Sequence, residues 1–284
     1  MKKGFFIQSN KKQILGAYLA KYAFEKTYRG SDPVEVHIML VEDIPMFSKF
    51  TGQSFIRKAD TNDVRKADPE DLQSFTLTRF LPPELMGYVG RAVVIDPDIF
   101  ALHDISELYD MDLGSASLAA CRKKDAWDSS VMVLDCAKLK HWNVEEWLTK
   151  LTRGSIDYDR IMTLKDEHNV LEIPRKWNDL DHLDTQTRMI HTTNRITQPW
   201  RTGLPIDFTR NKMPKYFGLI AREPIHKILG KYKTHYQPHP DKKIENWLIG
   251  LVKNALHDGA ITKEQVKHEV TEGHVRKDIF ELIK

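Results

Sequence analysis

A strand, a long helix and a second strand open the chain, and this order constrains the fold more than any other feature. Residues 4–8 form a short apolar and aromatic run, which predicts a buried strand. Residues 11–28 carry apolar side chains at helical spacing, after a possible capping pair, Ser9 and Asn10. Residues 34–40 predict the next strand. Strand, helix and strand in this order predict an α/β sheet.

Further segments extend this pattern. We predict strands at 91–95, 131–134 and 188–192. Residues 42–73 predict loops and short helices. We predict a short helix that starts within 82–86, and another that runs from a capping box at Asp104 through Tyr109. Longer helices are predicted at 136–151, 244–257 and 263–282. The 284 residues fit one large domain with an appendage, which we place at 1–205 and 206–284.

Composition indicates a cytoplasmic protein. Cys121 and Cys136 are the only cysteines and form no zinc pattern, so a reducing compartment is expected. No apolar stretch approaches the roughly 18 residues of a membrane helix. The apolar run at the N-terminus is too short for a signal peptide.

Asp96-Pro97-Asp98 is the motif that carries chemistry. It follows the apolar run 91–95, and residues i and i+2 of an extended segment project to the same face. The residue before proline is biased toward extended backbone, and ligands of open α/β sheets bind at the carboxyl ends of strands. Two adjacent carboxylates suit a hard divalent cation such as Mg²⁺ or Mn²⁺, although Asp-Pro-Asp is also an ordinary turn.

The surroundings of this motif resemble those in glycosyltransferase family 8. Residues 91–109 read RAVVIDPDIFALHDISELY, similar to the family's strand, Asp-x-Asp and Asp-Ile-x-Glu-Leu helix start. In the family's order follow 127–135 (WDSSVMVLD), 157–159 (DYD) and 190–200 (IHTTNRITQPW). The resemblance covers about residues 4–203. It implies a GT-A nucleotide-diphospho-sugar transferase fold, with a mixed central sheet flanked by helices and a C-terminal helical extension.

The resemblance also implies site residues. Asp96, Asp98 and His191 match the metal ligands, and the set suits Mn²⁺ or Mg²⁺. The residues that match donor-binding positions are Gln8, Ser9, Asn10, Arg79, Asp96 and Gln198. Asp128, Asp157 and Asp159 match positions near the reacting sugar. Read without the family, His191 is a core histidine, Asn10 a helix cap and Arg79 a surface residue.

Several positions depart from the family. Asp128 stands where the family has Asn, and Ser130 stands where it has Gly. Tyr158 replaces the Gln that lies against the reacting face of the sugar, and Gln198 replaces the Lys that meets the diphosphate. The glycine of the turn after His191 is also absent, with Thr193 and Asn194 in that region.

The expected function is metal-dependent hexosyl transfer with retention. The donor is a nucleotide diphosphate sugar, UDP-linked, and the acceptor a glycan, glycolipid or small molecule. The alternative is a catalytically degenerate nucleotide-sugar-binding protein on the same fold. The mechanism stays open between a carboxylate nucleophile and same-face attack. No glycine-rich loop follows the first strand, which argues against a nucleotidyltransferase or a dehydrogenase, and nothing points to nucleic acid.

Residues 209–235 are basic and aromatic. They hold seven basic residues and one acid, in a chain whose formal net charge is +3. Such a segment can lie on the inner face of an anionic membrane, where the acceptor would be lipid-linked. It can equally be a solvated helix that packs on the domain.

Overall fold

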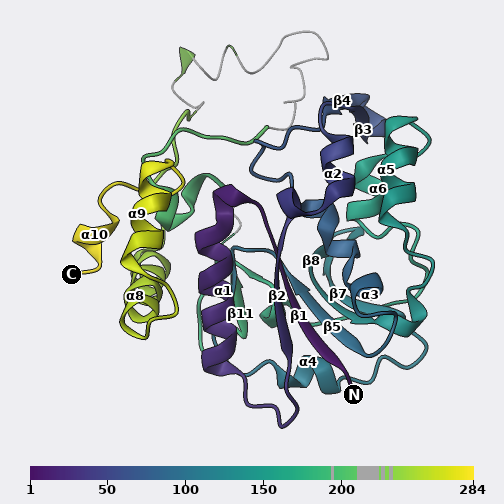
Figure 1. The fold of residues 1–284 in the computed structure, drawn as a ribbon, viewed down its shortest axis with the longest axis horizontal. Helices are drawn as coiled ribbons and strands as arrows, with labels where there is room; N and C mark the ends of the chain where they lie inside the picture. Colours follow the sequence, from purple (N-terminus) through teal and green to yellow (C-terminus); the bar gives the residue numbers. More distant parts are fainter. Residues whose placement is uncertain (193–194, 210–223, 225–227, 230–232) are drawn as a thin grey trace.

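A six-stranded mixed sheet forms the centre of the computed structural model, which describes residues 1–192, 195–209, 224, 228–229 and 233–284 (Figure 1). Its strand order is β2-β1-β5-β8-β7-β9, with β1 parallel to β2 and β5, and β8 antiparallel to β5 and β7. The strands are β1 Lys3–Ser9, β2 Glu35–Leu40, β5 Arg91–Ile95, β7 Leu118–Lys123, β8 Ala126–Asp135 and β9 Val170–Glu172. The predicted α/β sheet is confirmed.

Two smaller sheets surround this one. The first pairs β10 Asp179–Leu180, β11 Met189–His191 and β6 Ile99–Ala101. The second is a hairpin of β3 Ser54–Lys58 and β4 Asp63–Lys66, inside the stretch for which we predicted loops and short helices.

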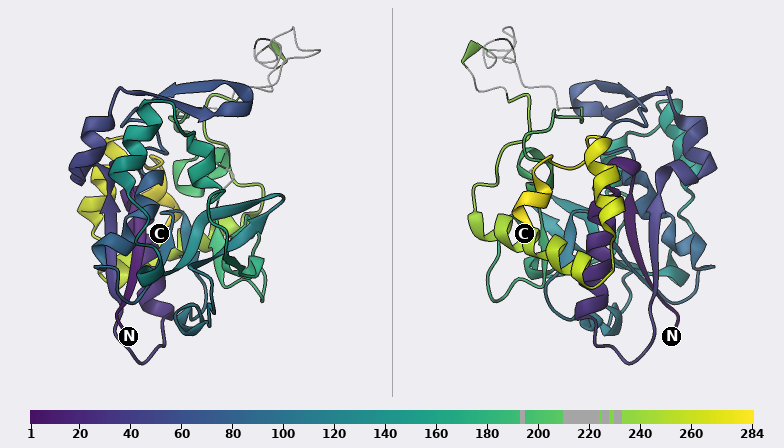
Figure 2. Two further views of the ribbon diagram at one scale, coloured as in Figure 1. Left: turned by 90° about the vertical axis from the view of Figure 1, so that its right-hand side faces the viewer. Right: turned by 60° about the vertical axis from the view of Figure 1, so that its left-hand side comes forward.

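Helices cover both faces of the central sheet. They are α1 Ile14–Thr27, α2 Pro45–Phe50, α3 Pro82–Leu85, α4 Ser106–Asp110, α5 Val144–Thr152, α6 Tyr158–Met162, α8 Lys242–His257, α9 Lys263–Thr271 and α10 Ile279–Leu282. Short 3-10 turns connect several elements, among them η4 Thr76–Phe80. Figure 2 shows α8 and α9 beside α1, and α5 and α6 beside the hairpin.

Alternate residues of the sheet pack into two cores. Val93 and Ile95 belong to the core that includes α1, whereas Ala92 and Val94 belong to the core that includes α5. The apolar face of α8 shares the first core with α1. Phe100 of β6 lies against both Trp200 and Trp247. The helical C-terminal part is therefore packed directly on the sheet domain.

Some predicted helices begin or end elsewhere. The stretch 136–151 divides into a 3-10 turn and α5, because Asn143 caps the backbone N–H of Glu146 and starts a new helix there. The stretch 263–282 divides into α9 and α10, and Gly273 follows α9 with a φ of 75°. Asp104 accepts from the N–H of Ser106 instead of forming a capping box with Glu107.

Most of the basic segment lies outside the described residues, since 210–223, 225–227 and 230–232 are not described. Our two interpretations of that segment therefore stay predictions. Within the described ranges, no helix combines the length and apolar character that crossing a membrane requires.

Candidate active site

The Asp-Pro-Asp motif lies between two strands, where the sequence predicted it. β5 ends at Ile95 and β6 begins at Ile99, so Asp96 and Asp98 stand in the connection, and both are buried. The N-terminal part of α1 lies against this connection. A Cβ added to Gly16 would meet the carbonyl oxygen of Pro97 at 2.5 Å, so only glycine permits this close approach.

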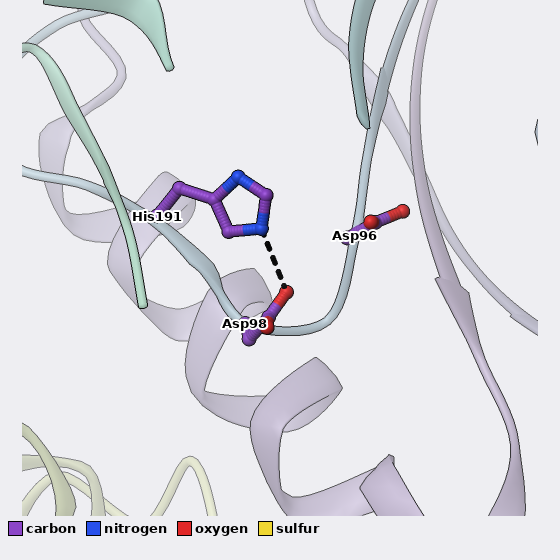
Figure 3. A group of neighbouring side chains, drawn as sticks. All are labelled: Asp96, Asp98 and His191. Carbon is purple, nitrogen blue, oxygen red and sulfur yellow. Dashed lines mark ion pairs between the residues drawn. The ribbon is translucent and has the colours of Figure 1, made fainter. Parts of the chain in front are cut away.

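His191 reaches the two carboxylates through the small sheet. β11 pairs antiparallel with β6 and places His191 opposite Ile99, next to Asp98. Nε2 of His191 lies 3.5 Å from Oδ1 of Asp98 (Figure 3). One ligand atom from each of Asp96, Asp98 and His191 can be chosen so that all three lie within 4.8 Å of one another. Two oxygens and one imidazole nitrogen at this separation form a donor set for one divalent cation.

Asn178 orients His191, and sequence reasoning missed it. The Asn178 amide donates from Nδ2 to Oγ of Ser130 at 3.0 Å, so its Oδ1 is the acceptor that faces Nδ1 of His191 at 2.7 Å. In the neutral imidazole the proton therefore lies on Nδ1, and Nε2, which faces Asp98, is the nitrogen left to bind a cation. Asn178 lies in no recognisable motif, and only the fold brings it to the histidine.

Arg79 is buried rather than at the surface. Its Nε donates to Oδ1 of Asp96 at 2.8 Å, and its Nη2 donates to the other carboxylate oxygen. Its Nη1 donates to Oγ of Ser129 at 2.9 Å. Burial raises the pKa of Asp96, and Asp98 raises it further, while Arg79 opposes both.

Charge also changes the pKa of His191 and Asp128. Burial alone would lower the pKa of His191, but the charges of Asp98 and Asp96 raise it overall. Burial alone would raise the pKa of Asp128, but His191 and the hydrogen bonds from Ser130 lower it overall. The cluster is therefore a strongly coupled, buried set of charges.

Gln198 contacts the second carboxylate. Its Nε2 donates to Oδ2 of Asp98 at 2.9 Å, and its Oε1 is buried without a hydrogen-bond partner in the described part of the chain. Gln198 therefore lies beside the candidate metal ligands, where it contributes an amide dipole and no charge.

A cavity of about 230 Å³ opens over this cluster, and we call it the carboxylate cavity. Its polar lining residues include Gln13, Arg57, Arg79, Asp96, Asp98, Asp128, Ser129, Ser130, Tyr158, Asp159, His191, Arg195 and Gln198. Asp157 is absent from this lining, because its carboxylate accepts the N–H of Arg160 at 2.7 Å and caps α6.

Gln8 and Ser9 end β1 and Asn10 follows them, but none of the three lines the cavity. All three are fully buried. Asn10 caps the N–H of Gln13 and donates from Nδ2 to the carbonyls of Asp71 and Leu72 at 3.2 Å. The loop that contains Asp71 therefore covers the end of β1.

The fold is that of a GT-A transferase, and Asp96, Asp98 and His191 form a candidate cation site within it. The chain belongs to glycosyl transferase family 8, because the family model matches residues 8–201, more than half of its length. The protein is accordingly a glycosyltransferase, as the resemblance predicted. No curated protein matches the chain.

Several solved structures are similar to this chain at low sequence identity. An active-site mutant of LgtC is 11% identical with a TM-score of 0.50, over 70% of this chain and 89% of that one. The galactosyltransferase LgtC with donor and acceptor sugar analogues is 13% identical, with a TM-score of 0.47 over 70% of this chain and 89% of that one. GlyE of Streptococcus pneumoniae TIGR4 is 14% identical, with a TM-score of 0.49 over 70% of this chain and 56% of that one.

Proposed function

We propose that the protein transfers a hexose, with retention and with the help of a divalent cation, from a UDP-linked sugar to a glycan, glycolipid or small acceptor. The observation that carries this proposal is the convergence of Asp96, Asp98 and His191 at one wall of the carboxylate cavity. The three residues come from two separate elements, and the cluster is buried beside open space large enough for part of a donor.

The residues present fit a cation. Asp96, Asp98 and His191 would hold it, and Asn178 presents the histidine with the lone pair toward the site. An imidazole next to carboxylates favours Mn²⁺ over Ca²⁺, with Mg²⁺ as the alternative. Such an ion supplies Lewis-acid stabilisation of the diphosphate leaving group.

The chain's own residues have distinct tasks in this proposal. Arg79 fixes the orientation of Asp96 through its two donors. Asp128, held by Ser130, and Asp159 face the cavity where the sugar would lie. Asp159 is therefore better placed than Asp157 to act as a nucleophile or to stabilise positive charge on the sugar during same-face attack.

Binding of the donor's nucleoside at the end of β1 requires a rearrangement of the loop that covers it. We keep Gln8, Ser9 and Asn10 as proposed nucleoside contacts. They can reach a ligand only after Asn10 releases the backbone of residues 71–72. Gln13 and Gln198 already line the cavity and are available to the donor without that change.

The remaining proposals concern the whole chain. We retain residues 1–205 as the catalytic domain and 206–284 as an extension that contributes to acceptor choice. Peripheral contact of residues 209–235 with the inner face of a membrane remains our proposal, supported by the charge of that segment.

A screen of nucleotide sugars by thermal shift with Mn²⁺ tests the proposed donor class. A ligand that binds the native state raises apparent stability by about 2.7 kcal/mol at 100 times its Kd. We expect several degrees of stabilisation by a UDP-sugar with Mn²⁺, and little in Asp98→Asn. Equal shifts in the two proteins, or none with any nucleotide sugar, would count against the proposal.

A further inference from the structure

A second cavity lies beside the first, and no step of the proposed reaction uses it. It has a volume of about 280 Å³ and is enclosed by α2, the β3–β4 hairpin, the loop before η4, and α6. We call it the hairpin cavity. Residues that define it are Phe47, Phe50, Phe55, Arg57, Thr76 and Tyr158.

Four aromatic side chains, Phe47, Phe50, Phe55 and Tyr158, line it together with polar and charged residues such as Glu42, Arg65 and Asp68. Phe50 and Phe55 lie 5.6 Å apart, and Phe55 and Tyr158 lie 5.8 Å apart, measured between ring centroids. Aromatic walls of this kind bind flat apolar groups, and an apolar cavity of about 150 Å³ already accepts benzene. The hairpin cavity therefore has room for a substituted ring.

The two cavities share a wall on the sugar side of the site. Tyr158 lines both, and its neighbour Asp159 lines the carboxylate cavity. The three candidate metal ligands line only the carboxylate cavity. Arg57, Gln73 and Thr76 also line both cavities, so a group in the hairpin cavity would lie next to the carboxylate cavity.

The shared wall is held in place. The hydroxyl of Tyr158 is hydrogen-bonded to Oγ1 of Thr76, and the guanidinium of Arg57 lies over its ring at 5.0 Å. Arg57 forms no ion pair with a carboxylate of the described residues. An electron-rich or anionic substituent on the bound ring would therefore find a cation at this wall.

We propose that the hairpin cavity is a subsite for the acceptor, and that it binds an apolar, ring-bearing aglycone. This inference rests on the proposed function, because that function places the sugar beside Asp128 and Asp159. The donor's nucleoside is the rival occupant. Against it, Asp96, Asp98 and His191, which would hold the donor's diphosphate through the cation, line only the carboxylate cavity.

Binding of paired glycosides tests the proposal. The probes are 4-nitrophenyl and methyl glycosides of glucose and galactose, and their Kd values are measured by ligand-observed NMR without donor or metal. We expect the nitrophenyl glycoside to bind at least about tenfold more tightly than its methyl counterpart, because only its ring enters the cavity.

A matched pair of variants localises the site. Ser48 lines the hairpin cavity, whereas Lys49 on the same helix does not, and both are exposed. We expect Ser48→Trp to fill the cavity and remove the preference for the nitrophenyl ring, while Lys49→Trp keeps it. An unchanged preference in Ser48→Trp, or no preference in the wild type, would overturn the proposal.

Competition separates the two occupants. With saturating UDP and Mn²⁺, we expect the Kd of the nitrophenyl glycoside to stay within about twofold. If UDP displaces the nitrophenyl glycoside from the wild type, and Ser48→Trp weakens the binding of UDP, the cavity holds the nucleoside and the acceptor assignment is overturned. Failure of the proposed function would appear as a lack of hexose transfer, which this binding experiment does not measure.

Discussion

At the scale of single residues, the site depends on side chains that hold the candidate metal ligands in position. Arg79 holds Asp96 by two hydrogen bonds, and Asn178 holds His191 by one of 2.7 Å. Each partner fixes one candidate metal ligand before any cation arrives. Second-layer contacts of this kind commonly change metal affinity by about 10–100-fold.

Asn178→Leu should therefore weaken Mn²⁺ binding by about 10–100-fold, because Nδ1 of His191 loses its acceptor and the ring loses its orientation. The free Mn²⁺ signal in electron paramagnetic resonance measures this directly. Asn178→Asp keeps an acceptor at the same position and should retain most of the affinity. Wild-type affinity in a folded Asn178→Leu protein would show that Asn178 does not orient the histidine.

At the scale of elements, local capping decides where helices begin. Thr262 and Gln265 form a reciprocal capping box, in which Oγ1 of Thr262 accepts the N–H of Gln265 at 3.1 Å and Oε1 of Gln265 accepts the N–H of Thr262 at 2.7 Å. This box starts α9 and separates it from α8.

Thr262→Ala should lower the free energy of unfolding by about 1 kcal/mol, since it leaves a helix N-terminus without its cap. Urea unfolding followed by circular dichroism provides the measurement. Thr262→Ser keeps the hydroxyl and serves as the control. If alanine and serine give the same midpoint, the cap contributes nothing to stability.

The elements that sequence reasoning predicted are those with strong local patterns. β1, β5 and the Asp-Pro-Asp connection follow from apolar runs and a motif, and His191 follows from the family match. β11 lies within the strand predicted at 188–192, whereas β6 and β10 have three and two residues, too few for periodicity to distinguish them. Asn178 could not be predicted, because it precedes β10 and reaches His191 only through the pairing of β10 with β11.

At the scale of the whole molecule, the C-terminal helices and the sheet share one core. Leu248 of α8 is fully buried in the cluster that contains α1 and β5. Tyr22 of α1 donates to Asp258 just beyond α8, at 2.8 Å. We therefore expect the described parts of the chain to unfold as one unit.

Leu248→Ala should cost about 2–5 kcal/mol through the cavity that it leaves in this core. Tryptophan fluorescence and far-ultraviolet circular dichroism should report a single, shifted transition. Asn254→Ala, on the exposed side of the same helix, should change stability by less than about 0.5 kcal/mol. An early transition of the C-terminal helices alone would contradict a shared core.

Sugar transfer by this protein should depend on the buried carboxylates, and turnover of the best donor from the screen measures that dependence. UDP release and hexose transfer are measured with Mn²⁺, after EDTA treatment, and in Asp98→Asn. We predict turnover in the wild type with Mn²⁺, and a loss of about 100-fold or more in the other two. Undiminished turnover in Asp98→Asn would show that transfer does not need this carboxylate, and donor binding by the wild type without any release of UDP would show that the protein is not a transferase for that donor.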